Sequence, residues 1–281
     1  MKFKIISDRS LYPLRNFRTV QEYGSTIKSA NIPFDLVEHL QRYNNRNEPL
    51  EWLDAGCGLR VALHTGINLH RGYIRGTGID CCDDYKYMSS DDADRIEQNI
   101  RNQPHVPLRY NHQLNIRACE LDPDICFIQG DIGSMSLNKR FNLITSIFVL
   151  QYSQDPFSDW VNLFNHLAPN GLLLTNLIIP ETNSDIVKMY SRFIAMIQTL
   201  GISADIYVSP SRKEDGTSRY RVYMLARLTN QINLKLSFTS KEVEAKEICT
   251  PLEEPFSIFS VSYKNVEVSL NNSDKLIKIS I

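Results

Sequence analysis

The chain has 281 residues and a mass of 32.3 kDa, enough for one elaborated domain or two small ones. Hydrophobic residues make up 42% of it and charged residues 22%, a composition that excludes a largely disordered protein. The 31 basic and 32 acidic side chains leave a net charge of -1. This balance excludes a protein that binds nucleic acid mainly through an overall positive charge, although a local basic patch is still compatible with it.

Residues 1–48 are predicted to form an N-terminal helical extension. Thr19 and Glu22 have the spacing of a capping box, in which each side chain satisfies a free backbone N–H at a helix start. Pro33 is expected to open a second helix, since apolar residues follow it at helical spacing.

Residues 49–228 alternate short apolar strands with amphipathic helices, which is typical of a parallel sheet with helices on both faces. Residues 102–120 break this rhythm and are expected to be an insertion over a sheet edge. The predicted strands are Leu50–Asp54, Tyr73–Asp80, Ile125–Ile128, Phe141–Ser146, Leu172–Ile178, Asp205–Val208 and Tyr220–Leu228.

Two later helices carry clear boundary signals. Asp155 and Pro156 are predicted to cap a helix that Asn170-Gly171 ends. Another helix is predicted from Ser184 to Gly201, with apolar residues at helical spacing between them.

Residues 229–281 differ from the rest because their apolar residues alternate in three short runs separated by turn residues. We expect a small C-terminal antiparallel β appendage. It is the candidate for a homodimer contact or for closing over a substrate.

The turn after the first strand is the most informative stretch. Asp54 ends the strand, and Gly56 and Gly58 follow, where glycine permits positive φ and close approach of a ligand. A dinucleotide fingerprint would need a third glycine at position 61, which is Val61. A carboxylate beside the turn repels phosphate and suits a ligand with an ammonium group. The alternative is a tight strand–helix turn that binds nothing.

This stretch resembles motif I, D-x-G-x-G-x-G, of the class I methyltransferases that use S-adenosylmethionine (SAM), with Arg60 at the third glycine. Four further resemblances follow in the family's order within about residues 50–228. They are Thr77-Gly78-Ile79-Asp80 at the second strand, Phe127–Ile132 at the third, Phe141–Tyr152 with Asn142 for an acidic residue, and Leu167–Leu174 with Asn170 for a glycine. Taken alone, Asp80 would fit a helix cap and Gly130-Asp131 an ordinary turn.

The resemblance implies an α/β, Rossmann-like three-layer sandwich with a mostly parallel seven-stranded sheet. It also implies SAM as cofactor and S-adenosylhomocysteine as product, with Asp80 accepting from the ribose hydroxyls and Asp131 from the adenine amine. The implied cofactor-binding residues are Asp54, Gly56, Cys57, Gly58, Asp80, Cys81, Gly130, Asp131, Ile132, Ser146, Ile147 and Phe148.

Methyl transfer depends mainly on positioning, and a base is needed only when the acceptor keeps its proton at neutral pH. Gln151, Tyr152 and Tyr23 are the predicted substrate-pocket residues, and Tyr152 is the catalytic candidate. A packed aromatic side chain is the alternative for Tyr152. Arg18 and Tyr23 are candidates for a lid, and Arg60 is expected to lean into solvent.

Three functions follow, in order of preference. The first is a SAM-dependent methyltransferase acting on an O, N, S or C nucleophile of a small molecule, or of a protein side chain. The second is a catalytically silent SAM-binding scaffold or partner subunit. The third is an RNA methyltransferase using the basic stretch Arg212, Lys213, Arg219, Arg221 and Arg227, although motifs for holding a flipped base are missing and a charge run is usually a solvated face.

The expected compartment is the cytoplasm. No apolar run approaches the roughly 18 residues that span a bilayer, and the N-terminus lacks the apolar segment of a secretory signal. The six cysteines contain no C-x-x-C pair, and no cysteine or histidine cluster suggests a metal. We therefore expect reduced thiols, no membrane contact and no metal.

Overall fold

The structure is a computed structural model. The residues that it describes are 18–43, 47–81, 83–86, 88–101, 115–153, 155–180, 202–212, 218–228, 235–238, 242–247, 259–264, 267–272 and 275–280. The predicted helix from Ser184 to Gly201 lies outside them, as does most of the insertion at 102–120.

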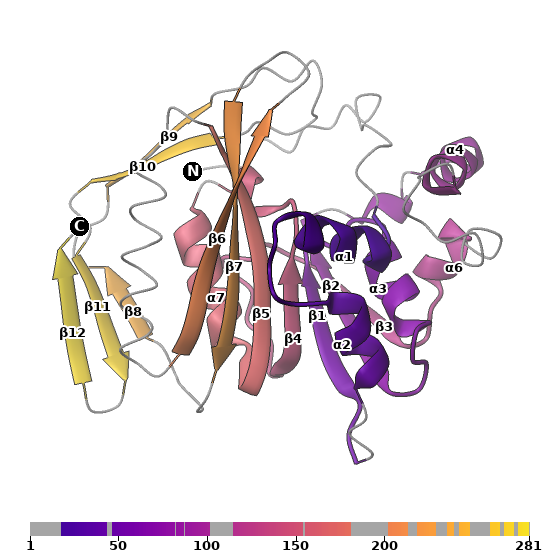
Figure 1. Ribbon diagram of the computed structural model, residues 1–281, viewed down its shortest axis with the longest axis horizontal. Helices are drawn as coiled ribbons and strands as arrows, with labels where there is room; N and C mark the ends of the chain where they lie inside the picture. Colours follow the sequence, from indigo (N-terminus) through magenta and orange to yellow (C-terminus); the bar gives the residue numbers. More distant parts are fainter. Residues whose placement is uncertain are drawn as a thin grey trace.

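A seven-stranded sheet forms the centre of the molecule, in the order β3-β2-β1-β4-β5-β7-β6 (Figure 1). Neighbouring strands from β3 to β5 run parallel, while β7 is antiparallel to both β5 and β6. This confirms the mostly parallel, Rossmann-like sheet. The strands are β1 (Leu50–Ala55), β2 (Ile74–Asp80), β3 (Ile125–Gln129), β4 (Phe141–Ser146), β5 (Leu167–Pro180), β6 (Ile202–Arg212) and β7 (Ser218–Leu228).

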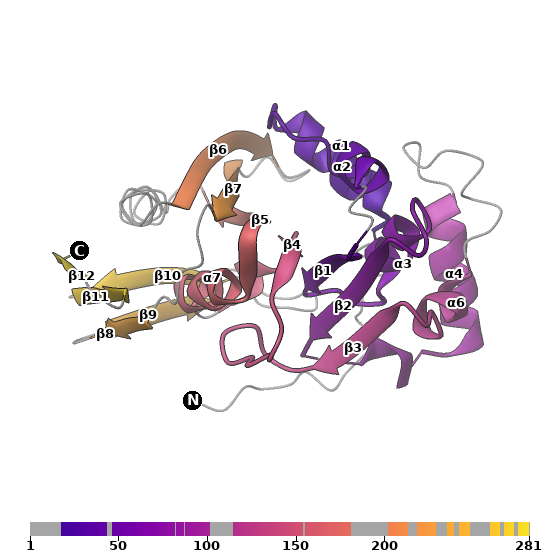
Figure 2. The same cartoon turned by 90° about the horizontal axis from the view of Figure 1, so that it is seen from below.

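Helices cover both faces of this sheet (Figure 2). On one face α1, α2 and α3 pack over buried Trp52, Leu143 and Leu174. On the other face α7 places Trp160 against β5, where its Nε1 donates to Thr175 Oγ1 at 2.8 Å. The bounds are α1 (Val20–Ser29), α2 (Leu36–Arg42), α3 (Val61–Ile67), η2 (Asp84–Lys86), α4 (Ser90–Arg101), α6 (Ile116–Glu120), η3 (Leu150–Tyr152) and α7 (Pro156–Asn165).

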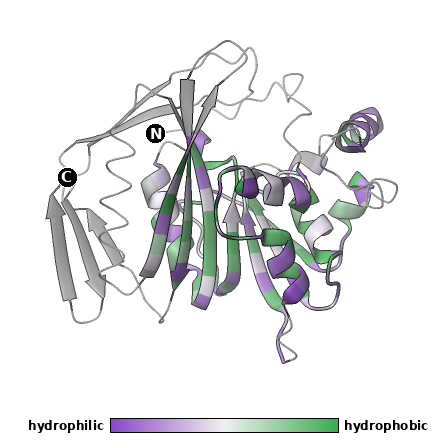
Figure 3. Cartoon of the chain, in the orientation of Figure 1, coloured by the Kyte–Doolittle hydropathy of each residue, from purple (hydrophilic) through white to green (hydrophobic). Residues whose placement is uncertain are grey.

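Hydrophobic residues are frequent along the strands, whereas the helices mix hydrophobic and hydrophilic residues (Figure 3). Burial of such side chains contributes about 25 cal/mol per Å² of apolar surface removed from water. Trp52 and Trp160 are both fully buried, one on each face of the sheet. The core therefore consists of two apolar layers with the sheet between them.

The predicted helix caps at Thr19 and Asp155 are confirmed, but the predicted start of α2 and the predicted end of α7 are wrong. The Thr19–Glu22 capping box is present, and Asp155 caps α7 with Pro156 in its first turn. However, α2 is capped by Asp35 rather than opened by Pro33. The helix predicted to reach Asn170-Gly171 already ends at Asn165, because Leu167 pairs with Phe141 in the parallel ladder. Asn170 does adopt the left-handed conformation, with φ of 61°.

The C-terminal strands are antiparallel, as predicted, and make two separate sheets (Figure 1). One pairs β9 with β10, and the other has the order β12-β11-β8. Their bounds are β8 (Lys235–Phe238), β9 (Glu242–Glu247), β10 (Phe259–Lys264), β11 (Glu267–Asn272) and β12 (Lys275–Ser280).

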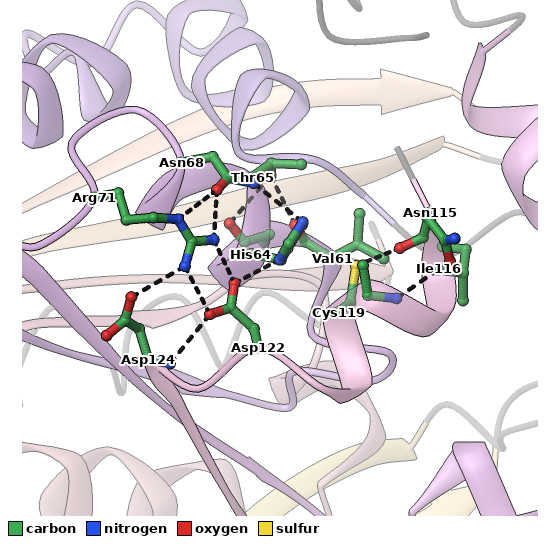
Figure 4. A network of polar contacts seen from close by, with 12 residues as sticks. Val61, His64, Thr65, Asn68, Arg71, Asn115, Ile116, Cys119, Asp122 and Asp124 are labelled. Atoms are coloured by element: carbon green, nitrogen blue, oxygen red, sulfur yellow. Dashed lines mark hydrogen bonds and ion pairs between the residues drawn. The ribbon is translucent and has the colours of Figure 1, made fainter. Parts of the chain in front are cut away.

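A polar network joins α3 to the loop before β3 (Figure 4). Asp122 is buried, and Arg71 and His64 each hydrogen-bond it, at 2.9 and 2.6 Å. The other ring nitrogen of His64, Nε2, accepts a hydrogen bond from Asn68 Nδ2 at 3.0 Å, while Nδ1 donates to Asp122. Both ring nitrogens are thus engaged, and we assign this His–Asp pair a structural role.

Two features are absent from the described ranges: a membrane-spanning helix and a cluster of metal ligands. Among those residues, no helix is both long and apolar enough to cross a membrane. The same part of the chain holds no group of three or more His, Cys, Asp or Glu side chains placed to bind a metal ion.

Candidate cofactor-binding site

The site begins where the chain order of the strands reverses, between β1 and β4. Open α/β sheets bind ligands at such a point, outside the carboxyl ends of the strands. The turn after β1 contains Gly56 and Gly58, with φ of 82° and 48°, and leads into α3. The structure therefore brings the predicted glycine turn to the position where this sheet topology binds a ligand.

The backbone N–H groups of this turn are already used by the protein. Gly56 and Cys57 donate to the carbonyl oxygen of Ile79 at 2.7 and 3.2 Å. Gly58 donates to Asp80 Oδ2 at 2.9 Å. A phosphate-binding turn needs N–H groups pointed at the ligand. This turn instead presents carboxylates, which disfavours a phosphorylated ligand.

Asp54 is fully buried at the end of β1. Thr145 Oγ1 donates to its Oδ1 at 2.6 Å, and Tyr23 Oη lies 3.5 Å from its Oδ2. Burial raises the pKa of Asp54 to about 7, and the nearby Asp80 carboxylate adds to this rise. In the described part of the chain no basic side chain forms an ion pair with Asp54. A cationic ligand group would therefore be stabilised here.

Acidic side chains also follow β2 and β3. Asp80 is half-buried and accepts from Gly58 through one oxygen, while Cys81 Sγ lies 3.4 Å from the other. Gly130 donates to the Asp80 carbonyl at 2.9 Å, which fixes the turn after β3 beside β2. Asp131 is exposed and accepts from the Ser134 N–H at 3.1 Å. Three adjacent strands thus end in carboxylates.

The loop after β4 closes the other side of the glycine turn. Phe148 has a left-handed backbone, with φ of 63°, and its N–H donates to Asn176 Oδ1 at 2.5 Å. A Cβ added at Gly56 would lie only 2.2 Å from Val149 Cγ2. Gly56 is therefore required by the protein's own packing, independently of any ligand.

No protein-family model matches this chain. A malonyl-[acyl-carrier protein] O-methyltransferase from Halalkalibacterium halodurans is 27% identical over 203 residues, which cover 66% of this chain and 63% of that protein. The match thus spans less than two thirds of that relative's length. In sequence, this chain is therefore similar to a methyltransferase over the matched residues.

Two solved methyltransferase structures align with part of this chain. N-methyltransferase NodS from Bradyrhizobium japonicum WM9, in complex with S-adenosyl-L-homocysteine, aligns with a TM-score of 0.37 and 16% identity, covering 69% of this chain and 84% of that one. Phosphoethanolamine N-methyltransferase 2 from Haemonchus contortus, in complex with S-adenosyl-L-methionine, aligns with a TM-score of 0.42 and 11% identity, covering 78% and 60%.

Two of the substrate-pocket candidates lie in the loop after β4. Gln151 is buried and its Nε2 donates to the Phe148 carbonyl at 2.8 Å. Tyr152 is half-buried and closes η3 by donating its N–H to the Val149 carbonyl. Their roles toward a substrate stay predictions.

Tyr23 reaches the same region from α1. Burial, reinforced by the Asp54 carboxylate, raises the pKa of Tyr23 well above its ordinary value. Its hydroxyl therefore stays protonated and can donate but not act as a base. Arg18, just before α1, lies with its guanidinium carbon 4.4 Å from the centroid of the Phe148 ring. The N-terminal helix thus borders the site, and its role as a lid stays a prediction.

The expectation for Arg60 was wrong. Its side chain is buried, pairs with Asp83 at 2.7 Å and lies over the Phe127 ring, 3.9 Å from the centroid. The long apolar stem and planar guanidinium suit a cleft between aromatic rings, which sequence position alone does not reveal. Its φ of 58° shows that the third position of the motif needs a left-handed backbone even without glycine.

The histidine at the end of α7 does not join this site. His166 is buried at the end of α7, where its Nε2 accepts from the Leu137 N–H and its Nδ1 donates to the Asn162 carbonyl, at 3.0 and 2.7 Å. We therefore assign His166 a packing role. His105 and His112 lie outside the described residues.

Sequence reasoning missed two polar residues inside apolar strands, Thr145 and Asn176. Both are fully buried and hold neighbouring groups of the site, through Asp54 and Phe148 respectively. The signal was a threonine and an asparagine in otherwise apolar runs, since a buried polar group needs a hydrogen-bond partner.

A groove of about 640 Å³ lies elsewhere, between α2 and the end of β7. Its lining includes Phe34, Tyr43 and Arg227. Arg227 pairs in register with Leu172, which is near the amino end of the parallel strands. We place the candidate site at the glycine turn rather than in this groove, because the buried carboxylates and the reversal of strand order coincide there.

Proposed function

We propose that this chain is a SAM-dependent methyltransferase that binds its cofactor across the carboxyl ends of β1, β2 and β3. The main support for this proposal is the glycine turn with its neighbouring carboxylates. The N–H groups of this turn donate to acceptors within the protein. Asp54 and Asp80 lie beside the turn, and no basic side chain among the described residues forms an ion pair with Asp54. Such a site favours a nucleoside carrying positive charge over a phosphorylated one.

The residues present fit such a cofactor. Asp80 would accept from the ribose hydroxyls, and buried Asp54 would face the ammonium group. Asp131, at the end of the next strand, would accept from the adenine amine. When bound, SAM supplies a methyl carbon made electrophilic by the positively charged sulfur.

The chain's own contribution to transfer is positioning and exclusion of water. Val149 packs tightly on Gly56 and Phe148 is held by Asn176, so the wall on the β4 side is rigid. Among the described histidines, His64 and His166 have both ring nitrogens engaged. His39 lines the α2 groove and His70 stacks on Tyr73 just before β2, so both lie away from the glycine turn. An acceptor that needs no histidine base fits this arrangement, and Tyr152 remains the proposed substrate contact.

The proposed acceptor is an O, N, S or C nucleophile of a small molecule. The relative from Halalkalibacterium halodurans is by name an O-methyltransferase of a malonyl group on acyl-carrier protein, which supports an oxygen acceptor. The RNA alternative has less support, since Arg221 and Arg227 lie six residues apart on β7, toward opposite ends of that strand.

Titration calorimetry tests the cofactor assignment. SAM and S-adenosylhomocysteine should bind, and ATP and NAD should bind far more weakly. Asp80→Ala should weaken SAM binding by about 1–3 kcal/mol, the usual cost of leaving buried polar groups unpaired. Asp91→Ala removes the same charge from an exposed position on α4 and should leave the affinity unchanged. Preference for ATP, or equal SAM affinity in both variants, would refute the proposal.

A catalytically silent SAM-binding scaffold is the second candidate, favoured by the engaged histidines. Turnover separates the two: tight SAM binding without methyl transfer to any of a broad acceptor panel would support the scaffold. The cytoplasmic location, the domain bounds 1–48, 49–228 and 229–281, and a homodimer through residues 229–281 also stay proposals. Sedimentation of the full chain and of a chain ending at residue 228 would test the dimer.

A further inference from the structure

Two guanidinium groups lie over the same aromatic ring next to the proposed methyl-transfer site. The Cζ atoms of Arg18 and Arg221 are 4.4 and 5.7 Å from the centroid of the Phe148 ring. The two distances share one end point, so the cations lie within about 10 Å of each other, roughly one Debye length at 0.1 M salt. Their mutual repulsion is therefore only partly screened.

Neither cation has a carboxylate partner among the described residues. In the same part of the chain Arg60, Arg71 and Arg117 each form an ion pair with an acidic side chain. The Nε atom of Arg221 is shielded from water and has no hydrogen-bond acceptor. A shielded, unpaired donor on a cation is costly, and an anion placed there would recover that cost.

Two polar side chains near Arg221, those of Tyr223 and Asn176, also have hydrogen-bond donors without an acceptor. Tyr223 is two residues away on β7, so both side chains lie on the same face of the sheet. Asn176 of β5 is directly opposite Tyr223 in the ladder. Tyr223 Oη and Asn176 Nδ2 are both buried without a hydrogen-bond partner in the described structure, although Asn176 Oδ1 is used by Phe148.

Each of these three unpaired groups is a hydrogen-bond donor. Arg221 Nε–H, Tyr223 O–H and the Asn176 amide N–H₂ all need an acceptor, and cross-strand neighbours on one face lie roughly 4.5–5.5 Å apart at Cβ. A carboxylate offers two oxygens with about four acceptor positions and one negative charge. It therefore matches both the number of missing acceptors and the uncompensated charge.

We propose that the methyl acceptor carries a carboxylate, which Arg221, Tyr223 and Asn176 bind, with Arg18 adding positive charge from beside the Phe148 ring. This assignment rests on the proposed function and specifies the substrate class of the same site. The carboxylate orients the acceptor on the β5–β7 side of the loop after β4, so that its nucleophile is presented toward the glycine turn.

The test measures binding of matched acids and amides to the full chain saturated with S-adenosylhomocysteine. Butyrate, hexanoate and octanoate are compared with the primary amides of the same lengths by titration calorimetry. Each acid should bind at least about tenfold more tightly than its amide, since hydrogen bonds to charged groups are the stronger ones. Arg221→Gln should abolish this preference, and Tyr223→Phe, which keeps the packed ring, should reduce it several-fold.

Arg227→Gln is the matched control, because it removes the same charge from the exposed end of the same strand and should leave the preference intact. Equal binding of acids and amides to the wild-type chain would overturn the inference. So would an Arg221→Gln variant that loses cofactor affinity while keeping the acid preference, because Arg221 would then serve the cofactor. Failure of S-adenosylhomocysteine to bind at all would instead refute the proposed function.

Discussion

Replacing Asp54 with asparagine tests the most consequential electrostatic feature of the site. Burial raises the pKa of this carboxyl from 3.8 to about 7. A raised carboxyl pKa means that the folded protein binds a proton that the unfolded chain has released. The associated stability is fully present below the unfolded pKa and is lost as the pH rises through 7.

The magnitude follows from the size of the shift. At about 1.4 kcal/mol per pKa unit, a rise of about 3 units corresponds to a loss on the order of 4 kcal/mol between pH 4 and pH 7. About half of this loss, roughly 2 kcal/mol, falls between pH 5.5 and pH 8.5, where most other groups do not titrate. Asp54→Asn should remove that share of the pH dependence.

Urea denaturation at pH 5.5 and 8.5 measures the effect. Asp159 is a useful comparison because it is also buried, burial also raises its pKa to about 7, and it lies on α7 rather than at the glycine turn. Asp159→Asn should remove its own share of the pH dependence of stability. SAM binding to the wild type should strengthen as the pH rises from 6 to 8, because a cation favours ionised Asp54, and Asp54→Asn should abolish that trend. An unchanged pH dependence of stability and binding in Asp54→Asn would refute the reasoning.

Three further predictions concern stability and are measured by urea denaturation. Gly56→Ala should cost about 2–4 kcal/mol, because its Cβ would collide with Val149 and φ is 82°; adding Val149→Ala should recover part of the loss, and no recovery would contradict the packing argument. Arg60→Gly should relieve a left-handed φ yet still cost about 1–3 kcal/mol, since Asp83 loses a buried partner; a stabilised variant would contradict this. Burial opposes ionisation of Asp122, but hydrogen bonds from Arg71 and His64 outweigh it and lower the pKa. Asp122→Asn should therefore cost about 1–3 kcal/mol at pH 7, and the gap should close as the pH falls below 4; a constant gap would contradict it.

Much of the fold could be predicted because local signals decide it. Phe141–Ser146 was predicted with its observed bounds, and the other six predicted strands all lie within or overlap observed strands. The Thr19 and Asp155 caps were also readable, since each satisfies N–H groups only three residues away. The start of β5 could not be predicted from the local sequence. Asn170-Gly171 has the pattern of a helix end, but pairing with β4 places Leu167 in the strand.

The candidate site divides in the same way. By itself the sequence determined that a carboxylate and glycines follow the first strand, and that acidic residues end the next two, because composition and order are local properties. Only the tertiary structure decided that Thr145 bonds Asp54 across 91 residues of chain, that Arg60 is buried, and that Arg221, Tyr223 and Asn176 share one face. Charge and burial are set by neighbours distant in the chain, and strand register, which no local pattern encodes, brings those neighbours together.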